Sequence, residues 1–413
     1  MRERAGLRGA GDRHETERVR GSGREPDRAT APGVDGGERE CTLADFMADV
    51  ASPSVPPAEQ WRASIVRLAA GEAERFLAFC GAHHLTVHDA IDRQLEDLAA
   101  VRLPSGSHEA RRRWIEDTVS ATGREAYGRW VYLPWARTAA HLLAADEYFD
   151  VITDRNRDKI TREEQRLLRT KRVGVMGLSV GGEAAVTLAQ EHLCGEIVLA
   201  DFDALDLSNL NRLGAGFDEL GQNKAVIVAR RIARIDPYLN VTLYREGVTE
   251  RNVEGFLEGL DLLVEECDGL RMKHDVRRLA RERGLNIVFA ADERGFLSVE
   301  PYADWPELRP FHGRIEQPQP PREAFATPLA FMQALTEWMG GWDRISERSR
   351  RSLEQLGATL CGYPQLASEA RYAAGQIGNV VRRLLLGERL RPVLTHLDLD
   401  ELLPSESRDA PDL

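Results

Sequence analysis

The feature that most constrains the fold is a regular alternation of strand-like and helix-like segments between Lys171 and Ala291. Short apolar runs, typical of strands, cover 172–177, 196–201, 240–246, 260–266 and 286–291. Segments with helical spacing of apolar residues cover 182–193, 223–235 and 272–284. Strands that alternate with helices are joined by right-handed crossovers and form a mostly parallel sheet. The sequence therefore predicts an α/β fold with a Rossmann-like, doubly wound sheet.

Polar residues follow three of these strands at the points where the strands end. They come after Met176, after Ala200 and within the stretch that begins at Glu265. Ligands of doubly wound sheets bind at the carboxyl ends of the strands. We therefore expect one composite site at that edge of the sheet.

The first strand runs into a glycine turn, "GLSVGG", that contains Gly177, Ser179, Gly181 and Gly182. A helix that starts at such a turn offers unpaired N–H groups and a positive dipole to a phosphate. Tight turns between a strand and a helix also need glycine for packing alone. The turn by itself leaves both interpretations open, although the small Ser179 would let a phosphate approach and would add a hydroxyl donor.

The second strand ends in a polar loop, "DFDALDLSNLNR", followed by "GQNK". Its candidate binding residues are Asp201, Asp203, Asn209, Arg212 and Lys224. An acidic residue about 20 positions after the glycine turn is suited to bind ribose hydroxyls. Cations beside a phosphate site neutralise charge during phosphoryl or nucleotidyl transfer. The alternative is a solvated loop in which Asn209 caps a helix.

Asp268 stands at the third polar strand end, directly after Cys267. A carboxylate close to a polyphosphate is suited to bind Mg²⁺. Taken alone, however, Asp268 fits a cap of the helix that follows better than it fits a metal ligand. Its significance depends on whether it lies beside the glycine turn.

The rest of the chain divides by composition. We expect a disordered Arg/Gly-rich arm at 1–42, a helical domain at 43–150, the nucleotide-binding domain at 151–390 and an acidic tail at 391–413. Three aromatic residues, Trp130, Tyr132 and Trp135, are expected to pack the helical domain against its neighbour, with ligand binding as the alternative.

Composition excludes several classes of protein. A net charge of −12 argues against a nucleic-acid-binding body. The sequence has no apolar run long enough to span a membrane and no evident signal peptide. Its five cysteines include no C-x-x-C pair, so no zinc site is expected. These features favour a cytoplasmic protein.

The stretch from Arg155 to Pro301 resembles the ThiF/MoeB/HesA superfamily of ubiquitin-activating-enzyme-like adenylyltransferases. The motifs that carry the resemblance are "GLSVGG", "DFDALDLSNLNR", "GQNK", "DP" at 236–237 and "CDG". Two positions depart from the family pattern, which usually has glycine in place of Ser179 and asparagine in place of Asp236.

The resemblance implies that ATP, and not a nicotinamide, binds at Gly177–Gly182, with Asp201 at the ribose. It implies that the triphosphate lies against Asn209, Arg212 and Lys224, that Asp268 binds Mg²⁺, and that Lys273 is a supporting cation. In dimeric members of the family an arginine from a leading segment reaches the ATP of the partner. Here that residue would be Arg155, or else Arg157, in a homodimer.

The implied reaction is attack of a carboxylate on the α-phosphorus of ATP, which gives an acyl-adenylate and pyrophosphate. The acceptor would be the C-terminus of a ubiquitin-like or sulfur-carrier protein, a peptide or a small acid. Many relatives then use a cysteine. The candidates for such a second step are Cys361, Cys267, Cys194 and, as a loop residue, His312, each of which is otherwise an ordinary packing residue.

Three other functions remain open. An NAD(P)-dependent oxidoreductase would share the glycine turn but would not require Arg212 and Lys224. A non-catalytic relative that binds a partner protein would be expected to lose the charged site residues, which are present here. A relative that modifies tRNA is disfavoured by the acidic body, although the Arg-rich arm is compatible with it.

Overall fold

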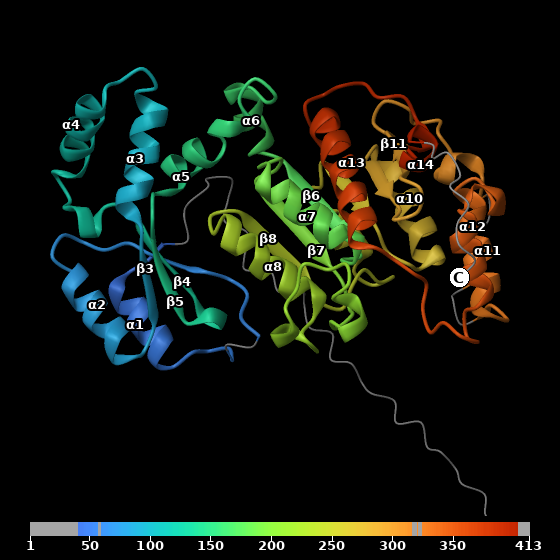
Figure 1. Ribbon diagram of the computed structural model, residues 1–413, viewed down its shortest axis with the longest axis horizontal. Helices are drawn as coiled ribbons and strands as arrows, with labels where there is room; N and C mark the ends of the chain where they lie inside the picture. The colour runs from blue at the N-terminus through green and yellow to red at the C-terminus, as the bar shows by residue number, and fades with distance from the viewer. Residues whose placement is uncertain (1–39, 57–58, 316–319, 321–323, 404–413) are drawn as a thin grey trace, which may run out of the picture.

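The computed structural model of the chain describes residues 40–56, 59–315, 320 and 324–403. Its centre is a seven-stranded sheet with the strand order β12-β11-β10-β9-β6-β7-β8 (Figure 1). The five strands from β8 to β10 are parallel. They are β6 (Arg172–Met176), β7 (Glu196–Ala200), β8 (Asn240–Tyr244), β9 (Leu262–Glu265) and β10 (Asn286–Ala290). All five were expected from the apolar runs, and the α/β fold is confirmed.

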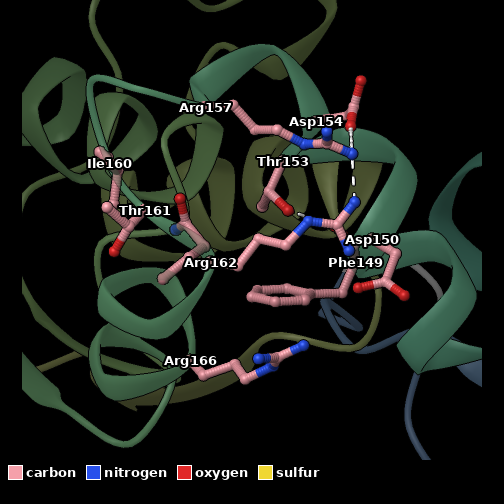
Figure 2. A pocket seen from close by; sticks show the side chains of 10 residues that line it. Phe149, Asp150, Thr153, Asp154, Arg157, Ile160, Thr161, Arg162 and Arg166 are labelled. Carbon is pink, nitrogen blue, oxygen red and sulfur yellow. Dashed lines mark hydrogen bonds and ion pairs between the residues drawn. The ribbon is translucent and has the colours of Figure 1, made fainter. Parts of the chain in front are cut away.

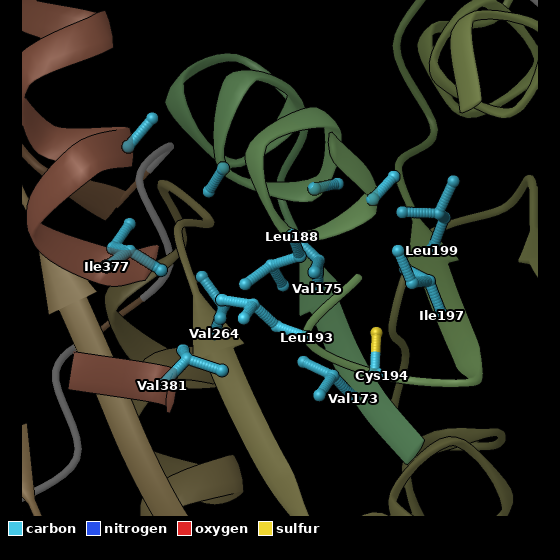
Figure 3. Close-up of a cluster of buried hydrophobic side chains, with 14 of the residues drawn as sticks. Val173, Val175, Leu188, Leu193, Cys194, Ile197, Leu199, Val264, Ile377 and Val381 are labelled. Carbon is cyan, nitrogen blue, oxygen red and sulfur yellow. The ribbon is translucent and has the colours of Figure 1, made fainter. Parts of the chain in front are cut away.

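Helices cover both faces of this sheet, as the doubly wound prediction requires. On one face lie α7 (Val180–Gln190), α8 (Lys224–Ile235) and α13 (Ala367–Leu385), and on the other α9 (Val253–Leu257) and α10 (Leu270–Arg283). Figure 3 shows the first of these cores, where the strands contribute residues such as Val173, Val264 and Ile197. Strands that are buried on both faces carry continuous apolar runs. The alternation of strands with helices could therefore be predicted from the sequence.

The sheet is mixed, which the sequence did not reveal. After β10 the chain turns back as β11 (Phe296–Glu300), which is antiparallel to β10, and β12 (Val393–His396) pairs antiparallel with β11. β12 lies within the segment at 391–413 that was expected to be a tail. Two helices, α11 (Pro328–Trp338) and α12 (Glu347–Glu354), precede α13, and α14 (Leu399–Leu402) follows β12.

The expectation of a purely helical N-terminal domain was wrong. This region forms a separate five-stranded sheet with the order β1-β2-β4-β5-β3. Its strands are β1 (Glu40–Cys41), β2 (Ser64–Val66), β3 (Thr86–Asp89), β4 (Arg129–Leu133) and β5 (Thr138–Leu142), accompanied by α1 (Leu43–Ala51), α2 (Ala73–Ala82), α3 (Ile91–Arg102), α4 (His108–Val119) and α5 (Ala145–Ile152). Pro134 lies in the short turn between β4 and β5 and does not break a helix. Short strands with few residues of alternation resemble helix segments in sequence.

The N-terminal region contacts the helix α8 and the turn between α8 and β8 of the large sheet. Arg230 donates its Nε–H to the carbonyl of Gln60 at 2.9 Å, and its guanidinium lies 5.5 Å from the ring centroid of Trp135. The hydroxyl of Tyr238 donates to the carbonyl of Leu143 at 2.6 Å. Trp135 therefore packs between the two sheets as expected.

The other two aromatic residues of that expectation have a different place. Trp130 and Tyr132 lie in the core of the N-terminal region itself, where Trp130 stacks on His141 with a centroid distance of 4.4 Å. They stabilise the small sheet and do not contribute to the contact between the sheets. Within the described residues, no helix is both long and apolar enough to cross a membrane.

Candidate active site

The glycine turn lies between β6 and α7, at the carboxyl edge of the sheet. Gly177 has a φ of +81°, and a Cβ there would lie 2.5 Å from the backbone of Glu266. A Cβ on Gly181 would lie 3.1 Å from Val175, and one on Gly182 would lie 3.1 Å from Val228. Backbone conformation and packing therefore require glycine at position 177, whereas a Cβ at 181 or 182 would need a neighbouring side chain to shift by a few tenths of an ångström.

Asp201 connects this turn to the end of β7. Its Oδ2 accepts from the backbone N–H of Leu178 at 2.6 Å, and its Oδ1 accepts from the N–H of Asp203 at 2.8 Å. The side chain is buried, and burial raises the pKa of this carboxyl. Asp201 therefore stabilises the two adjoining strand ends, and ribose binding by this residue stays a prediction.

Two further residues of the polar loop have local partners. The Nζ of Lys224 lies 2.8 Å from Oδ2 of Asp203, at the first residue of α8. The Oδ1 of Asn209 accepts from the N–H of Asp206 at 3.0 Å and closes a short turn. The capping interpretation of Asn209 is therefore confirmed for this structure, and Lys224 is placed beside the loop by an ion pair.

Arg212 reaches from the same loop to the glycine turn. Its Nε–H points at the Ser179 hydroxyl oxygen at 3.4 Å, and its Nη1 donates to Oδ1 of Asn211 at 2.9 Å. Burial lowers the pKa of Arg212, an effect that the negative charges of Asp292 and Asp268 oppose. Those two charges come from the ends of β10 and β9, so Arg212 lies where four strand ends meet.

Asp268 is exposed, directly after β9. It does not cap the next helix, because α10 begins at Leu270 with Gly269 as its N-cap and has no side-chain cap. The structure gives its carboxylate no hydrogen bond or ion pair among the described residues. Mg²⁺ commonly takes one or two protein carboxylates and completes its shell with phosphate and water, so one exposed carboxylate in this position fits the ion.

The described residues contain no group of three or more His, Cys, Asp or Glu side chains arranged to bind a metal ion. A site that bound Mg²⁺ would consequently rely on ligands from a bound polyphosphate as well as on Asp268. This is the arrangement that the resemblance implies.

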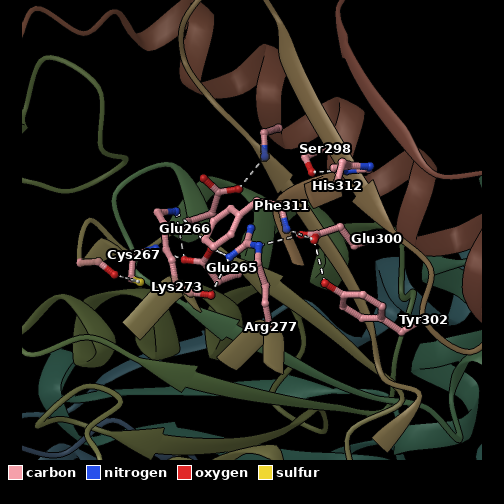
Figure 4. Close-up of polar contacts among 12 residues, drawn as sticks. Glu265, Glu266, Cys267, Lys273, Arg277, Ser298, Glu300, Tyr302, Phe311 and His312 are labelled. Carbon is pink, nitrogen blue, oxygen red and sulfur yellow. Dashed lines mark hydrogen bonds and ion pairs between the residues drawn. The ribbon is translucent and has the colours of Figure 1, made fainter. Parts of the chain in front are cut away.

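Behind Asp268 lies a buried charge network that sequence reasoning only touched (Figure 4). Both oxygens of Glu265 lie 3.1 Å from the Nζ of Lys273, and Arg277 joins Glu265 to Glu300. Although burial opposes ionisation, Lys273 and Arg277 lower the pKa of Glu265 to about 2. Among the described residues, Asp268 itself makes no hydrogen bond or ion pair with this network.

The network nevertheless supports the loop that carries Asp268. Oε1 of Glu265 accepts from the backbone N–H of Cys267 at 3.0 Å, one residue before Asp268. Lys273 is therefore connected to this loop through Glu265 and the backbone, and its role as a supporting cation stays a prediction. The visible signal in the sequence was a pair of glutamates, at 265 and 266, that ends an otherwise apolar strand.

Sequence reasoning missed the end of β10 as part of the site. Asp292 is buried there, and its Oδ2 accepts from Nε2 of Gln365 at 2.6 Å. The backbone carbonyl of Gln365 in turn accepts from Nδ2 of Asn211, the neighbour of Arg212, at 2.7 Å. The segment before α13 thus crosses the edge of the site. The polar pair at 292–293 directly after an apolar strand was the signal that could have identified it.

Arg155 lies away from these residues in the same chain. Its neighbour Asn156 donates to the carbonyl of Glu191, just beyond the C-terminal end of α7, at 3.1 Å. The glycine turn is at the other end of α7, which has 11 residues and is therefore roughly 16 Å long. Arg155 consequently cannot join Arg212 and Asp268 from the same chain.

The second candidate of that segment, Arg157, lines a pocket between α5 and α6 (Arg162–Leu168), shown in Figure 2. The pocket is also lined by Phe149 and by Arg162. Arg157 pairs with Asp154 there. Neither arginine of the leading segment therefore contacts the glycine turn of its own chain.

The candidate nucleophiles differ in their surroundings. Cys194 is buried in the main core, and burial raises the pKa of its thiol. Burial also raises the pKa of Cys267 well above its ordinary value. Both thiols are thus disfavoured as thiolates. Cys361 is exposed in the segment between α12 and α13, whereas the ring of His312 lies 3.1 Å from Ser298 and burial lowers its pKa.

Comparison with known proteins points to the family that the sequence motifs resemble. Residues 153–307 match the profile of the ThiF family. An uncharacterized protein of Mycobacterium tuberculosis (strain CDC 1551 / Oshkosh) is 38% identical over 315 residues, which are 76% of this chain and 42% of that protein. The tRNA threonylcarbamoyladenosine dehydratase of Bacillus subtilis (strain 168) is 32% identical over 32% of this chain and 54% of that protein. The chain spans about half the length of these relatives.

Two solved structures also resemble the chain over part of its length. The E. coli tRNA N6-threonylcarbamoyladenosine dehydratase in complex with AMP is 18% identical, with a TM-score of 0.41 over 58% of this chain and 98% of that chain. E. coli MccB with AMPCPP and MccA is 13% identical, with a TM-score of 0.38 over 61% of this chain and 69% of that chain. Residues 153–307 of the chain, which carry the motifs at the strand ends, therefore form a region that belongs to the ThiF family.

Proposed function

We propose that the protein is an ATP-dependent adenylyltransferase that activates a carboxylate as an acyl-adenylate and releases pyrophosphate. The observation that carries the proposal is the position of Arg212, which points at Ser179 in the glycine turn and lies within the electrostatic influence of Asp268. A helix N-terminus, a cation and an exposed carboxylate at one sheet edge suit a magnesium-bound polyphosphate. A hydride-transfer site would have no use for this set.

The residues of the chain would act by positioning and by charge. Arg212 and the start of α7 would bind the phosphates and offset the repulsion between them and the incoming carboxylate. Lys224 would exchange its contact with Asp203 for a phosphate oxygen. Asp268 would hold magnesium, which would supply Lewis-acid polarisation of phosphate oxygens. No general base is required, because the attacking carboxylate is already ionised at neutral pH.

The acceptor class is supported by the names of relatives. A probable molybdopterin-synthase adenylyltransferase of Porphyra purpurea is 24% identical over 39% of this chain, and a ubiquitin-like modifier-activating enzyme 5 of Drosophila ananassae is 29% identical over 32% of it. We propose an acceptor that bears a carboxylate: the C-terminus of a ubiquitin-like or sulfur-carrier protein, a peptide, or a small acid. We also propose that the protein acts in the cytoplasm and does not bind nucleic acid.

We further propose that the enzyme is a homodimer in which Arg155 completes the site of the partner. Its distance from the glycine turn of its own chain, along the full length of α7, supports a role in trans. The same distance is compatible with a surface residue, and complementation between two inactive variants distinguishes such a residue from one that completes the partner's site.

The experiment that tests the activity is pyrophosphate–ATP exchange, measured over a panel of small acids, peptides and Gly-Gly-terminated carrier proteins. Exchange that depends on one acceptor and on Mg²⁺ is the expected result. If ATP does not bind and the fluorescence of a nicotinamide cofactor changes when the protein is added, the oxidoreductase alternative would be supported instead. If ATP binds but no acceptor gives pyrophosphate exchange, the non-catalytic alternative would be favoured.

A further inference from the structure

A buried ion pair lies behind the loop that carries Arg212. Glu183, in the first turn of α7, is 7% exposed, and Arg231 on α8 contacts both of its oxygens. The Nη1–Oε1 distance is 2.7 Å and the Nη2–Oε2 distance is 3.2 Å. A two-point contact of this kind fixes the orientation of both side chains. Burial opposes ionisation of Glu183, but Arg231 lowers its pKa below the ordinary value.

The same carboxylate binds the backbone of the loop. Oε1 of Glu183 accepts from the N–H of Gly214 at 2.9 Å, two residues after Arg212. The guanidinium of Arg231 lies against Gly214 so closely that a Cβ there would be 2.3 Å from Nη2. The loop is therefore held from two sides, by a hydrogen bond and by contact with a side chain that cannot move without leaving Glu183.

This arrangement connects the two halves of the proposed phosphate site. Glu183 follows Gly182 directly and so belongs to the glycine turn and the helix start, whereas Gly214 belongs to the loop that carries Arg212. Arg231 also screens the negative charge that Glu183 would otherwise place near the phosphates. Neither residue reaches the reacting atoms, since both are engaged behind the loop.

We propose that Glu183 and Arg231 are positioning residues, which act on ATP through Arg212 by fixing the backbone at Gly214. This inference rests on the proposed function, because it assumes that Arg212 binds the triphosphate. It predicts that loss of either residue weakens ATP binding only as long as Arg212 is present.

The test is a double-mutant cycle on the full chain, with the dissociation constant of a non-hydrolysable ATP analogue as the readout and thermal unfolding as a check of folding. Arg231→Met is expected to weaken binding by about tenfold. In an Arg212→Met background, Arg231→Met is expected to raise the dissociation constant by less than about twofold. In an Asp268→Asn background it should still raise the dissociation constant by about tenfold. Arg234→Met, on the exposed side of the same helix, is the matched control and should bind as the wild type does.

Glu183→Gln keeps an acceptor for the N–H of Gly214 and should retain most of the affinity, whereas Glu183→Ala should not. This pair decides the question if Arg231→Met fails to fold. Additive losses from Arg231→Met and Arg212→Met would overturn the inference, as would equal affinities of the two Glu183 variants. A wild-type chain that does not bind the analogue at all would instead overturn the proposed function.

Discussion

The Nε–H of Arg212 points at the hydroxyl oxygen of Ser179 across a distance of 3.4 Å. The contact joins the loop after β7 to the turn after β6, and it is long enough to be a weak hydrogen bond at most. An arginine with so weak a partner can exchange it for a phosphate at little cost. The family pattern usually has glycine at this position, so the hydroxyl of Ser179 gives Arg212 a weak contact that the pattern would lack.

Replacing Arg212 should remove most of the activity. In Arg212→Met the phosphates would lose a fixed cation, and we expect pyrophosphate exchange to fall by about 100-fold or more. Arg212→Lys should recover only part of this loss, because an ammonium cannot reproduce the planar fork of donors. Unchanged exchange in Arg212→Met, with the fold intact by circular dichroism, would contradict the assignment.

Asp268 should determine the magnesium dependence. Asp268→Asn removes the exposed carboxylate while keeping the shape of the side chain, so half-maximal exchange should require about tenfold more Mg²⁺. A titration of Mg²⁺ at saturating ATP measures this directly. Asp275→Asn, on α10 beyond the site, serves as the control, and an identical magnesium profile for the wild type and Asp268→Asn would exclude Asp268 as a ligand.

The proposed role of Arg155 in trans predicts complementation. Chains with Arg155→Ala and chains with Arg212→Met should each be nearly inactive alone, since every site would lack one residue. Mixed after co-refolding or co-expression, they should recover up to about a quarter of the wild-type rate, because half of the dimers are mixed and each of these has one complete site. No recovery in a preparation shown to contain mixed dimers would rule out the shared site.

The charge network behind Asp268 should contribute strongly to stability. Lys273 is 1% exposed and lies 4.0 Å from the ring centroid of Phe289, so Lys273→Met leaves part of the buried charge of Glu265 uncompensated. We expect the free energy of unfolding to fall by about 3 kcal/mol. Arg278→Met breaks an exposed pair with Glu282 on the same helix and should change it by less than about 0.5 kcal/mol. Urea denaturation of both variants distinguishes these values.

Asp236, where the family has asparagine, should carry a stability cost that depends on pH. Burial raises its pKa from an ordinary value to about 6, so the folded state disfavours the carboxylate. The cost is present above pH 6 and disappears as the pH falls through 6 towards the unfolded value, since the folded carboxyl then takes up its proton. Asp236→Asn should therefore raise the free energy of unfolding at pH 8 by up to about 3 kcal/mol.

At pH 4.5, below the folded pKa but still above the unfolded one, the same substitution should raise the free energy of unfolding by only about 1 kcal/mol. Burial lowers the pKa of the neighbouring His192 to about 4, but both proteins carry that histidine, so its titration largely cancels in the difference. Urea denaturation at the two pH values provides the comparison. An equal effect of the substitution at pH 8 and pH 4.5 would show that the carboxylate is not the source of the cost.

The sequence by itself determined the central sheet and the edge at which the site lies. The five parallel strands are buried on both faces, so each is a continuous apolar run that local pattern alone identifies. Polar residues that end such runs, such as Asp201 and Asp268, mark the ends of the strands independently of how the rest of the chain folds. The carboxyl ends of neighbouring parallel strands then have to meet at one edge.

Only the tertiary structure decided the rest. The N-terminal sheet, β11 and β12 consist of short strands whose pairing joins residues far apart in the chain, and a run of three to five residues carries too little alternation to show it. The partners of Glu183 and Asp292 come from α8 and from the segment before α13. Which buried charge meets which depends on how the helices pack against the sheet, and no local pattern of residues contains that information.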